Sequence, residues 1–193
     1  MTGPRGDDDP GWRPALGGLA WGLVPGLAIR RARRRGGDAL LVLRGLFLSF
    51  CAAVVLVGVV VVILSAGEGL DGSADGTTVG VGVALAGLVL LVASAWRRPL
   101  DASSDAALAE SYRRRFFLRM AFAEAAALLG FAGFIVTGNP AVYAVGAAFT
   151  AIGFVLMAPT AGNLARDEEA VRARSGTGHS IVRALRATPP LGR

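Results

Sequence analysis

Lysine is absent from the chain, and cysteine and histidine each occur once. Because Cys51 has no second cysteine, a disulfide, a cysteine-based zinc site and a thiol redox pair are excluded. His179 stands alone in a glycine-rich stretch, so we expect a solvated side chain there and no metal ligand. The sequence therefore predicts neither a metal site nor a cofactor.

Catalytic motifs are missing as well. No Walker-type or dinucleotide glycine pattern follows a strand, and no strand is predicted. A nucleophilic hydroxyl needs a paired base, and three serines that could face the cytoplasm lack one: Ser103, Ser104 and Ser111. A lipid-modifying enzyme would need acidic or histidine residues gathered at the membrane surface. Asp101, Asp105 and Glu110 form no recognisable catalytic pattern, so they do not support one. We predict no catalytic residues and no enzymatic activity.

Long hydrophobic blocks dominate what the chain does contain. Over 193 residues, 53% are hydrophobic and the mean hydropathy is +0.55, which is typical of a polytopic membrane protein and not of a water-soluble domain. A helix needs about 20 apolar residues to cross a bilayer. The predicted fold class is all-α, a polytopic membrane protein with four transmembrane helices at about 45–65, 78–96, 116–137 and 141–158.

Polar segments divide the chain around these blocks. We expect a disordered tail, an interfacial basic segment, a transmembrane domain and a cytoplasmic tail with short helices, over 1–14, 15–38, 39–160 and 161–193 respectively. A flexible basic leader is the alternative for 15–38. Capping residues predict that the third helix begins near Ser104 and runs unbroken to about Val136. The short amphipathic helix at 180–186 could rest its apolar side chains on the bilayer.

The arginines define the predicted topology. Eight precede or open the first span, six lie between spans two and three, six follow span four, and the other two loops contain none. All 20 therefore fall on one side of a four-span arrangement, which predicts cytoplasmic N- and C-termini in the cell membrane. Since the arginines flank apolar spans, we expect them to meet the anionic lipids of the inner leaflet, and we expect no nucleic-acid partner.

Small residues mark the expected helix contacts, because they let neighbouring helices approach closely. The predicted contact residues lie on the second, third and fourth spans: Gly80, Gly82, Gly87, Ala126, Gly130, Ala144 and Ala148. The same smooth faces would suit a homo- or hetero-oligomer.

One acid lies inside an apolar span. Glu124 is five residues beyond Arg119, or about 7.5 Å along the helix. An ionised, unpaired acid in a membrane costs on the order of 2 to 3 kcal/mol or more, so Glu124 is a candidate functional residue. Arg44 on the first span lies at a similar depth and could form an intramembrane pair with Glu124. This pair, or a neutral Glu124 hydrogen-bonded between helices, would only fix packing. The alternatives are a Glu124 that carries a proton or ion, and a carboxylate that reaches the interface without a task.

The stretch 121–131, AFAEAAALLGF, resembles the carboxylate-bearing helix of the rotary ATPase proteolipid, subunit c. The glycine-rich second span and Arg97-Arg98-Pro99 resemble that family's inner helix and its cytoplasmic Arg-Gln-Pro loop, although Arg98 replaces the glutamine and two further spans flank the hairpin. The resemblance covers 79–137 and implies a ring-forming subunit in which Glu124 binds and releases a proton. More generally, the chain resembles four-helix integral membrane proteins of actinobacterial type, which implies a membrane location.

The predicted function is accordingly that of a structural or accessory membrane protein without enzymatic activity. The alternative is an ion- or proton-translocating subunit that uses Glu124.

Overall fold

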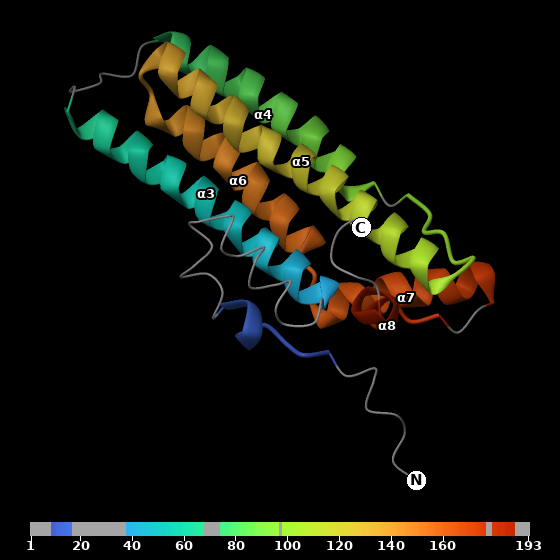
Figure 1. The fold of residues 1–193 in the computed structure, drawn as a ribbon. Coiled ribbons are helices and arrows are strands. Elements are labelled where there is room, and N and C mark those ends of the chain that lie inside the picture. Colours follow the sequence, from blue (N-terminus) through green and yellow to red (C-terminus); the bar gives the residue numbers. More distant parts are fainter. Residues whose placement is uncertain (1–8, 17–37, 68–73, 97, 177–178, 188–193) are drawn as a thin grey trace. The chain divides into compact units, whose positions relative to one another are not determined.

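The computed structural model describes residues 9–16, 38–67, 74–96, 98–176 and 179–187 (Figure 1). This part of the chain is helical and contains no strand, which confirms the all-α fold class. Its helices are α3 (Ala39–Gly67), α4 (Ala74–Ala95), α5 (Asp105–Thr137), α6 (Pro140–Met157), α7 (Ala161–Ser175) and α8 (Ile181–Ala187). Helices α3 to α6 are long and apolar enough to cross a membrane, so the prediction of a multi-pass protein with four spans is confirmed.

The chain divides into two compact units. The bundle unit comprises Phe50–Arg97 and Phe116–Met157. The terminal unit, named for the chain ends that it contains, comprises Met1–Ser49, Arg98–Arg115 and Ala158–Arg193. Helices α3 and α5 begin in the terminal unit and continue into the bundle unit.

The helices of the bundle unit have the length and the surface that a bilayer requires. Each contributes 18 to 22 residues to the unit, which is about 27 to 33 Å of helix against a hydrocarbon thickness of about 30 Å. Large apolar side chains are exposed on all four, for example Val62 (67%), Val89 (68%), Val136 (80%) and Val155 (73%). Lipid chains would cover such a surface without the free-energy cost that water imposes.

Small residues bring α5 and α6 into backbone contact. A Cβ atom added at Gly146 would lie 2.2 Å from the carbonyl oxygen of Ala126, and one added at Gly130 would lie 3.0 Å from the carbonyl oxygen of Val142. Because neither site has room for a methyl group, the two backbones touch as the small residues of the sequence predict.

Thr150 adds a polar contact to the same pair of helices. Its side chain is completely buried, and its hydroxyl donates to the carbonyl oxygen of Ala123 (2.7 Å) and accepts from the amide of Ala127 (2.9 Å). A hydroxyl that both donates and accepts leaves no unsatisfied polar atom in an apolar interface.

The predicted packing residues on α4 and α6 have mixed outcomes. The ring of Phe149 packs on Gly87 and would lie 2.6 Å from a Cβ atom added there. Gly82 is exposed, and a Cβ atom added there would have no neighbour within 4 Å. A Cβ atom added at Gly80 would lie 3.9 Å from a methyl group of Val142, which is ordinary van der Waals contact. Ala144 and Ala148 are also exposed and line a shallow apolar groove of about 790 Å³ between α3 and α6. Among the described residues, no neighbouring helix covers Gly82, Ala144 or Ala148, since α4 and α6 carry small residues on several faces and spacing alone does not select one.

The connection between α5 and α6 is a tight turn. Gly138 adopts a left-handed backbone (φ +68°), which a residue without Cβ adopts without strain. The Asn139 side chain accepts from the amide of Ala141 (2.9 Å), and α6 begins at Pro140. Ser104 caps α5 by accepting from the amide of Ala107 (3.1 Å), and α5 is continuous to Thr137 as expected.

The terminal unit corrects two predictions. Helix α8 does not rest on the bilayer, because Ile181, Ala184 and Leu185 are completely buried. Residues 9–16, which include part of the predicted disordered tail, are ordered, form a helical turn over 13–16 and bury Ala15. Most of the predicted interfacial basic segment, 17–37, lies outside the described residues.

The contact at Gly146 predicts a large and local effect on stability. Gly146→Ala should lower the free energy of unfolding by about 2 kcal/mol or more, because the new methyl group meets backbone and the helices must separate. Gly82→Ala is the matched control and should cost nothing, since its site is open. Thermal unfolding in detergent, followed by circular dichroism, measures both; equal melting temperatures for the two variants would contradict this packing of α5 on α6.

Candidate functional site

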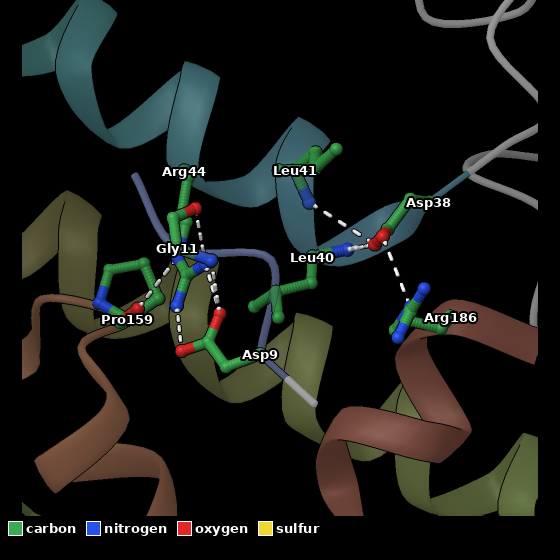
Figure 2. A network of polar contacts seen from close by, with 8 residues as sticks. All are labelled: Asp9, Gly11, Asp38, Leu40, Leu41, Arg44, Pro159 and Arg186. Carbon is green, nitrogen blue, oxygen red and sulfur yellow. Dashed lines mark hydrogen bonds and ion pairs between the residues drawn. The ribbon is translucent and has the colours of Figure 1, made fainter. Parts of the chain in front are cut away.

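Arg44 lies at the centre of a buried polar cluster in the terminal unit, shown in Figure 2. Its side chain is completely buried, and Nη1 and Nη2 donate to the two carboxylate oxygens of Asp9 at 2.5 and 2.6 Å. Nη1 also donates to the carbonyl oxygen of Gly11 (2.8 Å), and Nε donates to that of Pro159 (3.0 Å). This bidentate arrangement is the strongest common way to hold a carboxylate on a guanidinium.

Aromatic contacts complete the Arg44 cluster. The guanidinium carbon lies 5.1 Å from the centre of the Trp12 ring, which is within cation–π range. The same ring packs edge-on against Phe47, with 5.9 Å between centroids. Residues 9–12 thus surround the arginine with a carboxylate, a carbonyl and an aromatic face.

Asp9 is charged in this arrangement at neutral pH. The hydrogen bonds from Arg44 lower the pKa of Asp9 below its usual value, partial burial opposes this shift, and the amide of Gly11 adds to it. Since the pKa is lowered by folding, the pair contributes stability above the ordinary carboxyl pKa and loses it as the pH falls through the lowered value.

These contacts give Arg44 a partner other than Glu124, and the predicted intramembrane pair of Arg44 and Glu124 stays a prediction. Arg44 belongs to the terminal unit and pairs with Asp9, whereas Glu124 belongs to the bundle unit. Within the described residues, the Glu124 carboxylate makes neither a hydrogen bond nor an ion pair. Asp9, from a segment predicted to be disordered, supplies the anion that Arg44 needs.

Glu124 is half-buried on an outer face of α5. Residues spaced by three or four positions along this face are exposed and apolar: Phe117 (38%), Ala121, Leu128 (55%), Ala132 and Ile135 (59%). We name these residues together with Glu124 the α5 face. Glu124 is the only acid between Phe116 and Met157, so the α5 face carries one carboxylate in an otherwise apolar surface.

Arg119 contacts carbonyl oxygens at the C-terminal ends of two helices in the bundle unit. It is largely buried, its Nε donates to the carbonyl oxygen of Ser94 in the last turn of α4, and its Nη2 lies 3.5 Å from that of Leu156 in the last turn of α6. The last carbonyls of a helix have no partner within the helix and carry its negative dipole end, so a cation satisfies them well.

Ion pairs join the parts of the terminal unit. Arg115 is buried with Asp167 of α7 and forms an ion pair with it, and it also donates to the carbonyl oxygen of Arg98 (3.3 Å). Asp105 accepts from His179 Nδ1 (2.6 Å), and Asp38 pairs with Arg186 of α8 at 3.4 Å (Figure 2). His179, predicted to be a solvated side chain, is therefore a partner of the first residue of α5.

The described residues contain no group of three or more histidine, cysteine, aspartate or glutamate side chains that could hold a metal ion. No protein-family model, curated protein or solved structure matches the chain. The resemblance to the rotary ATPase proteolipid stays a prediction.

Sequence reasoning missed Asp9 as a site residue. The available signal was electrostatic: a buried arginine near the start of a span needs an anion, and an acidic run at Asp7–Asp9 lies outside any span. Spacing could not locate the contact, since 35 positions separate Asp9 from Arg44.

Proposed function

We propose that the protein is a non-enzymatic accessory component of the cell membrane, which associates with another membrane protein through the α5 face. Its task is to bind and support that partner. The observation that carries the proposal is Glu124, a carboxylate on an apolar outer face that has no partner among the described residues of its own chain.

The energetics of the carboxylate favour a partner. An ionised acid in the hydrocarbon region costs on the order of 2 to 3 kcal/mol or more, while Arg44, Arg115 and Arg119 all have partners within the chain. On a partner's transmembrane helix, an arginine or lysine at the matching depth would neutralise Glu124, and a hydroxyl would donate a hydrogen bond to it. Ala121 and Ala132 leave room on the α5 face for such a helix to approach.

The proposed orientation places the terminal unit in the cytoplasm. The support is the positive-inside tendency, because the arginines lie at the chain ends and between spans two and three. The same arginines would meet the anionic lipids of the inner leaflet. Single cysteines at Ser103 and Gly176, in a Cys51→Ala background, should stay unlabelled by an impermeant thiol reagent in intact cells and become labelled in opened membranes. Labelling of both in intact cells would reverse the orientation.

The alternative function is ion or proton translocation by Glu124. It predicts that the purified protein in liposomes carries a proton flux that Glu124→Gln abolishes. The accessory role predicts no flux that depends on Glu124. No second acid lies in α5 or α6 beyond Phe116 to relay a proton, which is why we place the accessory role first.

Photocrosslinking in native membranes tests the accessory role. A photoreactive amino acid at Ala121 or Leu128 should give one discrete protein adduct, and Glu124→Leu should lower its yield about tenfold or more, because the partner's polar group loses its counterpart. The same reagent at Val89, exposed on α4, is the control and should show no dependence on Glu124. Mass spectrometry of the adduct should find a basic or hydroxyl residue in the crosslinked helix.

The purified protein supplies the second readout. Glu124→Leu should leave its melting temperature unchanged or raise it, since the carboxylate has no partner among the residues that the structure describes and its removal relieves desolvation. A lower melting temperature for Glu124→Leu, or an adduct yield that Glu124→Leu leaves unchanged, would contradict the accessory role.

A further inference from the structure

Arg44 is the sixth residue of α3, near one end of a long apolar span. The apolar span Ala39–Ala66 has 28 residues, or about 42 Å of helix, against about 30 Å of hydrocarbon. Because the span is longer than the hydrocarbon is thick, we expect the first turns of α3, which include Arg44, at the headgroup layer, where phosphodiesters are the most abundant anions.

The residues that surround Arg44 form an oxyanion site. A planar guanidinium with two parallel N–H donors fits a carboxylate or a phosphate equally well. Within the described residues, the carboxylate of Asp9 fills this site. The Asp9 side chain is still 23% exposed, whereas that of Arg44 is completely buried. If Asp9 left, the carbonyl oxygen of Pro159 would be the only acceptor on the guanidinium that the described residues outside 9–16 supply. A buried guanidinium requires an anion, so another anion would have to replace Asp9.

The contacts of residues 9–16 with the rest of the terminal unit centre on this one side chain. Asp9, Gly11 and Trp12 all contact Arg44, and Trp12 adds Phe47. Ala15 is the one buried aliphatic residue of the segment. A competing anion at Arg44 would therefore remove most of the polar contacts that hold the segment.

We propose that Arg44 is a phosphate-binding site which Asp9 occupies from within the chain, and that residues 9–16 act as a displaceable plug. The ligand is a phosphodiester or phosphate monoester, either the headgroup of an anionic phospholipid or a free phosphate. Binding of the phosphate and docking of the plug exclude each other, so each weakens the other by the same factor. This inference does not depend on the role proposed for Glu124.

Release of the plug can be measured with a spin label on the intact protein. Arg13 is exposed, so Arg13→Cys in a Cys51→Ala background carries a nitroxide without disturbing the cluster. In nanodiscs of phosphatidylcholine the label should be immobilised. An equal mixture of phosphatidylglycerol and phosphatidylcholine should lower the docked-to-released ratio about tenfold.

Two additions separate the sources of the phosphate. Release by phosphatidylglycerol but not by inorganic phosphate identifies the lipid headgroup, and release by inorganic phosphate in phosphatidylcholine discs identifies a free phosphate. Asp9→Asn should release the label in every lipid, and Asp101→Asn, at an exposed acid, should leave it docked. An immobilised label under all conditions, or an Asp9→Asn protein that behaves like the parent, would overturn the proposal.

Competition between Asp9 and phosphatidylglycerol for Arg44 distinguishes this site from a general electrostatic attraction between the plug and lipid. Short-chain phosphatidylglycerol should raise the melting temperature of Asp9→Asn more than that of the parent protein, because its site is already vacated. The gain should disappear in the double variant Asp9→Asn with Arg44→Gln. Equal shifts in all three proteins would show that the lipid acts elsewhere and would refute the site.

Discussion

Buried arginines of α3 and α5 donate to carbonyls at or just beyond the C-terminal ends of α4 and α6, and the packing within each unit depends on this interaction. Within the bundle unit, Arg119 donates to the end of α4 and lies near the end of α6. Within the terminal unit, Arg44 binds the carbonyl that follows α6, and Arg115 binds one that follows α4. Since the last carbonyls of a helix have no internal partner, the contacts of Arg119 satisfy helix ends and a buried cation together, while Arg44 and Arg115 bind carbonyls of the connecting segments.

The same interaction gives the arginines two roles. Their position in the sequence favours one topology through the positive-inside tendency, and their side chains then become part of the packed structure. A guanidinium suits this use better than an ammonium group, because its donors are fixed in a plane and can reach two acceptors at once. Arg115 uses this geometry for a carboxylate and a carbonyl, and Arg44 for a carboxylate and two carbonyls.

Local features of the fold could be predicted from the sequence, and tertiary partners could not. The four spans follow from length and hydropathy, and the cap at Ser104 and the turn at Gly138 follow from residue chemistry at neighbouring positions. The partner of Arg44 could not be found in this way, because any acid outside a span could reach it. The burial of α8 could not be predicted for a related reason, because an apolar stripe on a short helix fits a bilayer and a protein core equally well. Gly82 and Gly87 differ only in which neighbour reaches them, and only the packed structure decides that.

Glu124 is the exception to the pattern of internal pairing. Every buried arginine discussed above is satisfied within its unit, so the chain does not need Glu124 for its own stability. Glu124 has no hydrogen bond or ion pair among the described residues and lies on a surface that would otherwise suit lipid, and the proposed accessory role rests on this contrast with the paired arginines.

The most direct measurement compares Arg119→Met with Arg114→Met in thermal unfolding of the purified protein. Arg119 is buried against helix ends, while Arg114 is exposed on the same helix. The account predicts that Arg119→Met lowers the free energy of unfolding by about 2 kcal/mol or more, because carbonyls at the ends of α4 and α6 lose their donor, and that Arg114→Met leaves it nearly unchanged. Equal stabilities of the two variants would contradict the central role of the buried arginines.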